Sequence, residues 1–344
     1  MVVVFNIWVS SFLYLTLRNT EVAVPAAVSM VYVTRARSSV MEIEAERGEL
    51  DPQVEAVLEM ANQFEVSFSD QTPEEARAML ETVTEMATED PVEVDDVREE
   101  VANGVPVRVY EPEDAPATVV FFHGGGFVVG SLDTHDALCR MIADESGLRV
   151  VSADYRLAPE HPFPAAVEDA YEATQWAANE YEGKVGVAGD SAGGTLSAVV
   201  CLMARDRGLP EVSHQTLIYP ATAYDRPMES RAQNASGYFV EADDLIWFLN
   251  NYIDSTVHTA NPYAFPMHAC DFEGVAPAHI LTAGYDPLRD EGAAYARRLR
   301  EDGVEVTHTN YGSMIHGFLN MEAFVDRAYD GVEDIAEQAR DELV

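Results

Sequence analysis

Lysine is almost absent from this sequence. Lys184 is the only lysine among 344 residues, and the other 20 of the 21 basic residues are arginine. The chain also carries 60 acidic residues, which give a formal net charge of −39 at pH 7. A field of this sign repels nucleic acid and anionic membrane surfaces, so the sequence argues against both as partners.

The same charge balance predicts a preference for high salt. Self-repulsion on this scale destabilises the compact state at ordinary ionic strength. Salt shortens the reach of the repulsion, to a Debye length of about 3 Å at 1 M. An acidic excess combined with almost no lysine resembles the composition of proteins from salt-accumulating halophiles. We interpret the composition as halophilic, with an ordinary acidic protein as the alternative.

Cysteine is nearly as scarce as lysine. Cys139, Cys201 and Cys270 are far apart in the chain and odd in number. Their spacing fits neither a metal-ligand set nor a disulfide framework. No cluster of histidine, cysteine and aspartate has metal-ligand spacing either. The sequence therefore predicts no metal, no cofactor and a reducing compartment, which favours the cytoplasm.

Long apolar runs are confined to residues 1–40. Val2–Leu17 is a nearly unbroken apolar stretch, and Val22–Val33 is a second one. A membrane-spanning helix needs about 20 apolar residues. A secretory signal needs a positive region ahead of the apolar run, whereas the first charge here is Arg18. Three interpretations stay open: a start extended beyond a true beginning near Met41, a membrane or export segment, and a helix docked on the fold. A genuine anchor would place the protein at a membrane.

Residues 41–90 predict a helical cap segment. Asp51-Pro52 is a signal for the start of one amphipathic helix, and Thr72-Pro73-Glu74-Glu75 is a signal for a second. From residue 91 to 344, short apolar strands alternate with helical patterns, which predicts a mostly parallel sheet covered by helices on both faces. The predicted strands are 92–97, 105–110, 118–122, 149–153, 185–188, 215–219, 279–283 and 304–309.

The strand and helix alternation is interrupted at about 220–275. This stretch is rich in tyrosine, asparagine and proline, and contains one predicted helix at Ala242–Ile253. It predicts a cap insertion over the carboxyl edge of the sheet, where ligands bind in such folds. Trp247 and Phe248 lie in this insertion and are candidates to line a pocket. The other helices are predicted at 134–146, 164–180, 192–207, 287–302 and near 319–341.

A G-x-S-x-G pattern lies between a predicted strand and a predicted helix. Its residues are Gly189-Asp190-Ser191-Ala192-Gly193, and a further glycine follows. A nucleophilic serine needs such a sharp strand-to-helix turn, because the turn exposes its hydroxyl to a bound ester. Glycine-rich turns after strands are common, so the pattern alone is a weak signal. The predicted strand before it and the predicted helix after it favour a nucleophilic serine. Asp190 has two interpretations, orienting the cap or a loop, and bonding only to local backbone.

A run of three glycines follows the predicted strand 118–122. The sequence there is His123-Gly124-Gly125-Gly126-Phe127. Successive glycines let neighbouring N–H groups point at one place, as an anionic tetrahedral intermediate requires. The alternative is a flexible turn, and the position one strand and helix before the next strand favours an oxyanion loop. His123 is expected to brace this loop.

These blocks together resemble the hormone-sensitive-lipase family of carboxylesterases. The resemblance is carried by His123–Gly126, by Tyr155–Glu160, by the Ser191 turn, by Asp286–Glu291 and by His316–Phe318. It covers about 115–320 with every block in order, and the two N-terminal helices fit the cap of that family. It implies an α/β-hydrolase fold with a helical cap.

The resemblance also implies an oxyanion hole. In the family, the second and third glycines of the loop and the residue after the serine supply the N–H groups. The matching positions here are Gly125, Gly126 and Ala192, with a possible shift of one position within the triplet. His123 and Gly124 then support the loop.

The acid and the base of the reaction are predicted from chain order. In this fold the order is serine, then an acid, then histidine, with the last two after consecutive strands. Asp286 follows the predicted strand 279–283, and His316 follows the strand 304–309. Both positions match the family blocks, so we predict Asp286 as the acid and His316 as the base.

Each of these two residues has rivals. Asp290 is the nearest acidic competitor, but it falls within a predicted helix. Among the histidines, His161 lies between Glu160 and Pro162 and is expected to brace a turn. His308 lies within a predicted strand. These positions favour Asp286 and His316.

The sequence therefore predicts a serine carboxylesterase, and the family resemblance implies that it acts on short- to medium-chain esters. An amide hydrolase or deacetylase with the same three residues is the alternative, together with a non-catalytic member of the fold that binds a small ligand. The expected partner is a small-molecule ester, without nucleic acid, and with a membrane only if residues 1–40 are an anchor. The number of subunits is open, a homo-oligomer included.

Overall fold

The structure is a computed structural model, and it describes residues 45–63, 67–87, 91–223 and 226–344. The chain divides into two units, Met1–Glu42 and Ile43–Val344. The interpretations of residues 1–40 thus concern a segment outside the described residues. Within the described ranges, no helix is both long and apolar enough to cross a membrane.

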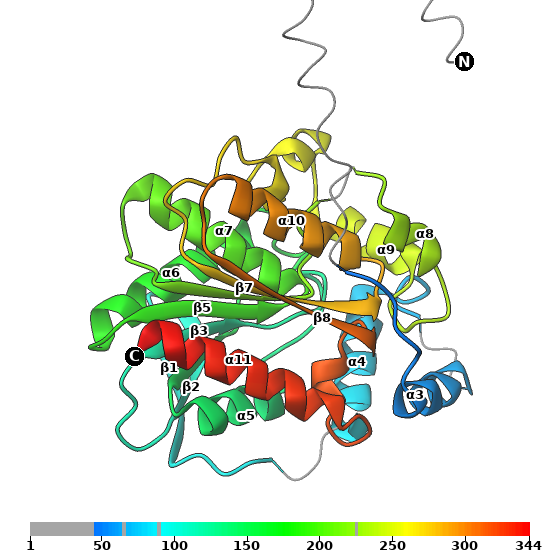
Figure 1. The fold of residues 1–344 in the computed structure, drawn as a ribbon, viewed down its shortest axis with the longest axis horizontal. Coiled ribbons are helices and arrows are strands. Elements are labelled where there is room, and N and C mark those ends of the chain that lie inside the picture. Colours follow the sequence, from blue (N-terminus) through cyan, green and yellow to red (C-terminus); the bar gives the residue numbers. More distant parts are fainter. Residues whose placement is uncertain (1–44, 64–66, 88–90, 224–225) are drawn as a thin grey trace, which may run out of the picture. The chain divides into compact units, whose positions relative to one another are not determined.

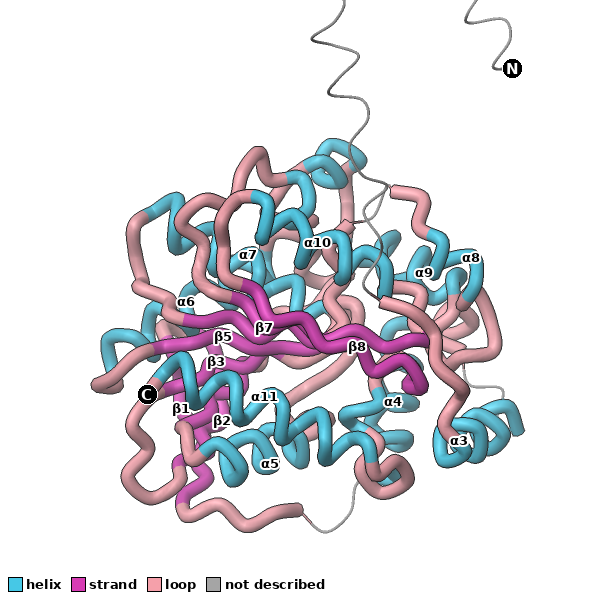
Figure 2. Tube along the Cα trace, in the orientation of Figure 1, coloured by secondary structure: helices cyan, strands magenta, loops and turns pink. Residues whose placement is uncertain are grey.

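The second unit is built on an eight-stranded sheet with the order β1-β2-β4-β3-β5-β6-β7-β8 (Figures 1 and 2). The β1–β2 and β2–β4 pairs are antiparallel, and every later pair is parallel. The predicted mostly parallel sheet is confirmed. The strands are β1 (Asp96–Ala102), β2 (Val105–Glu111), β3 (Thr118–Phe122), β4 (Arg149–Ala153), β5 (Val185–Asp190), β6 (His214–Ile218), β7 (Ala278–Tyr285) and β8 (Val306–Ile315).

Helices cover both faces of this sheet, as predicted. On one face lie α5 (Asp136–Ser146) and α11 (Arg327–Leu343), and on the other lie α6 (Ala165–Glu180), α7 (Ala192–Arg207) and α10 (Arg289–Glu301) (Figure 1). Each of the two helical layers packs against one face of the sheet and forms a separate hydrophobic cluster with it. The central strands β3 and β4 are buried along their whole length, since both of their faces are covered. Because the parallel strands run in the same direction, their carboxyl ends lie at one edge of the sheet, and the loops that follow them lie there too.

Two segments far apart in sequence meet above that edge. The first contains α3 (Pro52–Gln63) and α4 (Pro73–Ala87), and the second contains α8 (Glu229–Gln233), α9 (Ala242–Tyr252), η1 (Thr256–Ala260) and η2 (Pro266–His268). The Asp244 carboxylate joins them, because it accepts the Ser69 N–H at 2.9 Å and the Glu241 N–H at 3.1 Å. The Phe68 and Phe248 rings also meet, with centroids 5.2 Å apart.

Several predicted elements shift by one or two residues in the structure, and the last strand, predicted at 304–309, runs over Val306–Ile315. Two other elements differ more. The strand predicted at 92–97 is wrong, because β1 runs over Asp96–Ala102 and pairs with β2 through a hairpin. The turn residues Asn103 and Gly104 have φ of 50° and 98°, as a two-residue hairpin turn requires. The last helix, predicted near 319–341, begins at Arg327 and follows the short helix η3 (Phe318–Asn320).

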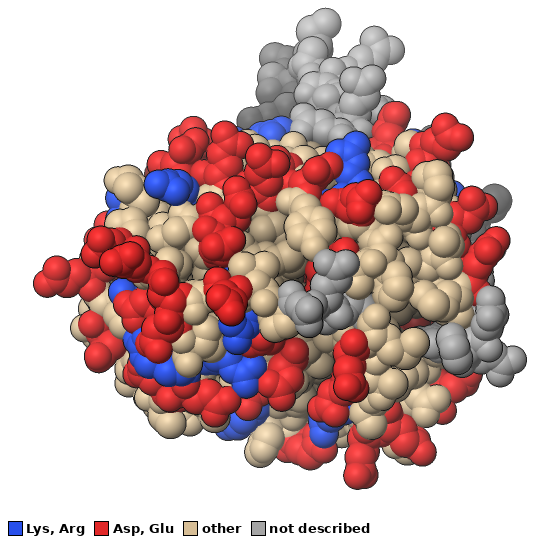
Figure 3. Space-filling view, turned by 90° about the horizontal axis from the view of Figure 1, so that it is seen from below, with Lys and Arg blue, Asp and Glu red and all other residues tan. Residues whose placement is uncertain are grey.

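The surface carries the acidic excess. Acidic side chains spread across the face shown in Figure 3, with basic side chains gathered in a few places between them. Two arginines each bind three carboxylates within 3.0 Å or less. Arg98 binds Asp96, Glu100 and Glu111, and Arg108 binds Glu99, Asp133 and Asp136. Each of these two arginines is thus outnumbered three to one by the carboxylates that it binds.

Candidate active site

The turn at Ser191 is a strained connection between β5 and α7. Ser191 has φ 54° and ψ −115°, a conformation that costs a non-glycine residue of order 1–3 kcal/mol and persists only where its surroundings enforce it. The Ser191 N–H donates to the Ile218 carbonyl at 2.8 Å, which fixes the turn to the end of β6. The expected strand–turn–helix context of Ser191 is present.

The glycines beside Ser191 allow a close approach of α7 to the sheet. A Cβ atom at Gly193 would overlap the Phe122 carbonyl oxygen at the end of β3. A Cβ atom at Gly189 would lie 2.5 Å from the carbonyl carbon of Gly193. Any larger residue at either position would push α7 away from β3, so the G-x-S-x-G pattern follows from packing.

The glycine loop after β3 is bound to the serine turn. The Gly124 N–H donates to Asp190 Oδ1 at 2.8 Å. Gly125 and Gly126 have φ of 111° and 58°, which favours glycine at both positions. Because the Gly124 N–H is used within the protein, Gly125 and Gly126 are the loop donors left for a ligand. This geometry favours the predicted register within the triplet.

His123 lies beneath the loop and has no exposure to solvent. Its ring stacks on Tyr155 with centroids 4.2 Å apart, and the Tyr155 hydroxyl donates to the His123 carbonyl at 2.7 Å. Burial lowers the pKa of His123 to about 3. A permanently neutral, stacked ring is suited to supporting the loop.

Asp286 and His316 meet at the carboxyl edge of the sheet. Asp286 follows β7, His316 follows β8, and His316 Nδ1 lies 2.8 Å from Asp286 Oδ2. The other carboxylate oxygen of Asp286 accepts the Leu288 N–H at 2.7 Å. Burial lowers the pKa of His316, but the charge and hydrogen bond of Asp286, with the charges of Asp190 and Glu291, raise it by more, so the net shift is upward. The pair therefore favours an imidazolium once His316 takes a proton.

The rivals of these two residues are engaged elsewhere. Asp290 accepts the Ser230 N–H at 2.7 Å and the Arg289 Nε–H at 2.8 Å. His161 is exposed, and His308 Nε2 lies 3.0 Å from the Thr282 hydroxyl. Neither rival histidine lines the pocket at the serine turn.

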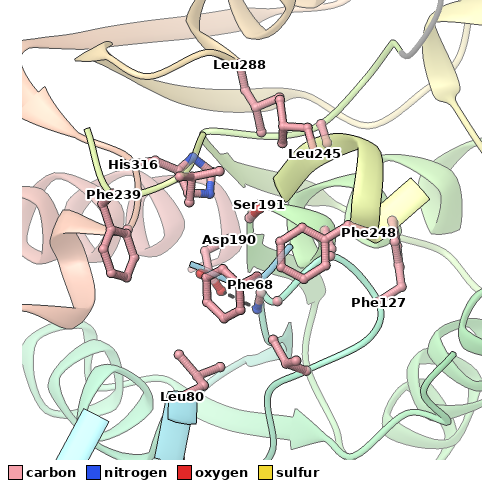
Figure 4. Close-up of a pocket in the computed structure, with 18 of the residues that line it drawn as sticks. Phe68, Leu80, Phe127, Asp190, Ser191, Phe239, Leu245, Phe248, Leu288 and His316 are labelled. Atoms are coloured by element: carbon pink, nitrogen blue, oxygen red, sulfur yellow. Dashed lines mark hydrogen bonds between the residues drawn. The ribbon is translucent and has the colours of Figure 1, made fainter. Parts of the chain in front are cut away.

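One pocket, with a cavity of about 310 Å³, brings the predicted site residues together. Ser191, His316, Gly125, Gly126 and Ala192 all line it. The rest of its wall is mostly apolar and comes largely from the two cap segments (Figure 4). Phe68 and Phe248 lie in front of the serine turn in this view, with Leu80 below and Leu245 above. Such a pocket suits an uncharged molecule with one reactive polar group.

Comparison with known proteins identifies the family. A family model described as alpha/beta hydrolase fold matches residues 119–320. The chain belongs to the α/β-hydrolase family. The predicted fold class is thereby confirmed, and a solved structure shows the same fold. This is a hyperthermophilic esterase from the archaeon Pyrobaculum calidifontis, 40% identical, with a TM-score of 0.81 over 86% of this chain and 99% of that one.

Curated relatives of this hydrolase are esterases. Carboxylesterase NlhH of Mycobacterium tuberculosis is 40% identical over 294 residues, which cover 80% of this chain and 92% of NlhH. Carboxylic ester hydrolase LipN of the same organism is 47% identical over 234 residues, covering 64% of this chain and 62% of LipN. The hydrolase is thus a carboxylic ester hydrolase, similar to the hormone-sensitive-lipase group that its motifs indicated.

Two further polar residues at the site of the hydrolase are not among the residues predicted from the sequence. His135 contacts Asp190 below the glycine loop, and no local pattern connects residues 55 positions apart. Glu291 lines the pocket, is fully buried, and accepts the Thr222 N–H at 2.8 Å and Arg231 Nη2 at 2.5 Å. Burial raises the pKa of Glu291 to about 7, with Arg231 and the backbone donors opposing the shift. Glu291 belongs to the block that carried the family resemblance, so a signal for it existed.

The cap contributes one of its two candidate aromatic residues to the pocket of the hydrolase. Phe248 lines the cavity, whereas Trp247 packs against the core beside it. A Cβ atom at Gly126 would overlap the Phe248 ring, so this ring rests directly on the glycine loop.

Among the described residues, no group of three or more histidine, cysteine or acidic side chains could hold a metal ion.

Proposed function

We propose that this hydrolase cleaves carboxylic esters through Ser191, with His316 as the base and Asp286 as its orienting acid. The observation that carries the proposal is the 2.8 Å contact between Asp286 and His316 Nδ1, because His316 lines the same pocket as Ser191. Because Nδ1 faces the carboxylate, Nε2 is the nitrogen left for the serine hydroxyl. A weak nucleophile such as serine needs a base held in this way.

The reaction then proceeds by acyl transfer. Ser191 Oγ bonds to the ester carbonyl carbon while its proton passes to His316 Nε2. The carbonyl oxygen becomes an oxyanion held by the N–H groups of Gly125, Gly126 and Ala192, which are placed before the reaction begins. The intermediate collapses as the alcohol oxygen leaves with the proton from His316. Water, deprotonated by His316, then attacks the acyl-enzyme and releases the acid and Ser191.

A fluorophosphonate probe tests this assignment. The hydrolase is expected to bind one probe molecule covalently at Ser191, identified by peptide mass spectrometry, and to give a burst with a p-nitrophenyl ester. Absence of labelling would favour a non-catalytic, ligand-binding member of the fold. A matched p-nitroanilide series separates ester from amide preference, and faster cleavage of the amide would contradict the proposal.

We further propose short- to medium-chain esters as substrates. The proposal is supported by the cavity of about 310 Å³ and by the aromatic wall that Phe68 and Phe248 form across it. Since the Phe248 ring rests on Gly126, an acyl chain bound at the glycine loop meets this ring within a few carbon atoms. The cap is therefore expected to set the chain length.

Replacing Phe248 by Ala is expected to move the preference to longer acyl chains. The missing ring opens the pocket above Gly126, and room for one more methylene is worth about tenfold or more in kcat/KM. The measurement is kcat/KM for p-nitrophenyl esters from acetate to decanoate. Trp176→Ala is the matched control, because Trp176 is also an aromatic residue packed against the core but lies outside the pocket lining, and its profile should follow the wild type. Identical profiles for wild type and Phe248→Ala would contradict this assignment.

We also propose that the protein is stabilised by multimolar salt. The support is the net charge of −39 and the sharing of single arginines among several carboxylates. Each such cluster still carries excess negative charge, which concentrated salt screens.

The buried free thiols Cys139 and Cys201 support a reducing location such as the cytoplasm.

Thermal unfolding is expected to shift strongly with salt. Each kcal/mol of relieved repulsion raises the Tm of a chain of this size by about 2 °C, so Tm should rise by roughly 10 °C or more between 0.1 and 3 M NaCl. Differential scanning calorimetry measures this, with esterase activity recorded in parallel. Sucrose at equal osmolality is the control for effects other than screening. Maximum Tm and activity near zero salt would contradict the halophilic interpretation.

A further inference from the structure

Asp190 is a buried carboxylate at the point where the serine turn meets the glycine loop. It is 4% exposed and immediately precedes Ser191. Its Oδ1 accepts the Gly124 N–H at 2.8 Å and lies 3.1 Å from His135 Nε2. Its Oδ2 receives a longer contact of 3.5 Å from the Asn320 amide, which follows His316 in the chain. None of these contacts belongs to the Asp286–His316 pair.

His135 is itself held in one orientation. It is 5% exposed, and its Nδ1 lies 2.9 Å from the Thr134 hydroxyl oxygen, which also accepts the Ser131 N–H at 2.9 Å. The ring packs beside His123, with centroids 5.5 Å apart. With Nδ1 fixed on Thr134, Nε2 faces both Asp190 oxygens, at 3.1 and 3.3 Å, and also lies 3.2 Å from the Gly124 nitrogen. To bond an ionised carboxylate, Nε2 must carry a proton.

Asp190 remains ionised despite its burial. Burial raises its pKa, but the charge and hydrogen bond of His135, with smaller contributions from His123 and His316, lower it by more, so the net shift is downward. An ionised carboxylate is acceptor-only, and hydrogen bonds to a charged acceptor are the stronger kind. The Gly124 N–H therefore meets a strong and fixed acceptor.

The Gly124 contact determines where the next two N–H groups lie. A loop of three glycines has little conformational preference of its own, so its position must come from outside. A Cβ atom at Gly124 would lie only 2.5 Å from Asp190 Oδ2, which places the carboxylate directly against the loop. Figure 4 shows Asp190 directly below Ser191. A rotation of this carboxylate would release Gly124 and displace Gly125 and Gly126.

We propose that His135 is a positioning residue for the oxyanion loop, acting through Asp190 on Gly124. The site then contains two histidine–aspartate pairs with separate tasks. The His316–Asp286 pair moves the proton, and the His135–Asp190 pair holds the donors that receive the negative charge. The inference rests on the proposed esterase function and extends it to the second pair.

The test compares His135→Phe with His135→Gln. Phenylalanine keeps a planar ring but cannot donate to Asp190, whereas glutamine restores an N–H donor. For p-nitrophenyl butyrate, His135→Phe is expected to lower kcat by about 10- to 100-fold. Complete removal of one oxyanion donor typically costs about 10²–10³ in kcat, and a displaced donor should cost no more than that. The KM should stay within about twofold of the wild-type value. His135→Gln should recover most of kcat.

Boronic acid binding gives a readout that a general loss of packing would not move. An alkyl boronic acid forms a tetrahedral anionic adduct with the serine, so His135→Phe should weaken it by the same factor as kcat. The corresponding primary alcohol has no oxyanion, and its inhibition constant should not change. His214→Phe is the matched control, because His214 is also buried but bonds to Thr216 outside the pocket lining. It should keep wild-type kcat and boronic acid affinity.

Asp190→Asn provides a second variant if His135→Phe does not fold. Its amide oxygen is a neutral and therefore weaker acceptor for the Gly124 and His135 N–H groups, so kcat and boronic acid affinity should again fall together. Unchanged boronic acid affinity in the folded variants, or no recovery with His135→Gln, would overturn the inference. Failure of the proposed function is distinct, because the wild type would then not hydrolyse the ester.

Discussion

Replacing Ser191 by Ala is expected to lower kcat for p-nitrophenyl butyrate by about 10⁴- to 10⁶-fold. Without the hydroxyl, His316 has no proton to take and no acyl-enzyme forms, so only binding and the N–H groups remain. The measurement is the steady-state rate at saturating ester, together with the burst. The fold should persist, since alanine keeps the Cβ atom and the Ser191 N–H bond to Ile218 is a backbone contact.

Ser197→Ala is the matched control for this substitution. Ser197 lies in the same helix, is fully buried, and its hydroxyl donates to the Gly193 carbonyl at 3.0 Å. Losing that bond is expected to cost about 1 kcal/mol of stability and little activity. Hydrolysis that survives in Ser191→Ala at more than about a hundredth of the wild-type rate would assign the reaction to another nucleophile.

The parts of the fold that were predictable from sequence are those with strong local patterns. The strands Thr118–Phe122 and Arg149–Ala153 and the helix Ala192–Arg207 have the predicted bounds. Buried strands are short apolar runs ended by turn residues, and they need no distant partner to be found. The serine turn is local in the same sense, because its strain and its small flanking residues occupy adjacent positions.

What could not be predicted depends on contacts between distant residues. The Gly124 N–H bond to Asp190 gives the glycine register a physical basis, and it joins residues 66 positions apart. Asp190 had two interpretations in the sequence, and its contacts with Gly124 and His135 favour loop orientation over purely local bonding. The Asp244 contact with Ser69 joins the cap segments over 175 positions. The misplaced first strand is different, since the local hairpin signal Asn103-Gly104 was present and overlooked.

Asp286→Asn is expected to lower kcat/KM by about 10⁴-fold at neutral pH. The carboxylate holds His316 with Nδ1 protonated and Nε2 free, and an amide in its place favours the wrong tautomer. The substitution is nearly isosteric, and the asparagine oxygen can still accept the Leu288 N–H. The loss should therefore appear in the rate more than in the Tm.

The pH profile of Asp286→Asn supplies the second readout. In the wild type, burial lowers the pKa of His316, and the charge and hydrogen bond of Asp286 together with the charges of Asp190 and Glu291 raise it by more. The proposed mechanism needs neutral His316, so activity in the wild type is expected to fall as the pH drops through this raised pKa. Without the charge of Asp286, only Asp190 and Glu291 oppose burial, so the pKa of His316 is expected to fall and the acid limb of kcat/KM to move to lower pH.

Asp290→Asn separates this effect from a general loss of negative charge. Asp290 is 1% exposed and four residues away, but its carboxylate bonds to Ser230 and Arg289. Its removal is expected to destabilise the contact between α8 and α10 while leaving the acid limb in place. If the Asp290 variant shifted the acid limb and the Asp286 variant did not, the acid of the site would be Asp290. The wild-type contact of 2.8 Å between His316 and Asp286 argues for the opposite result.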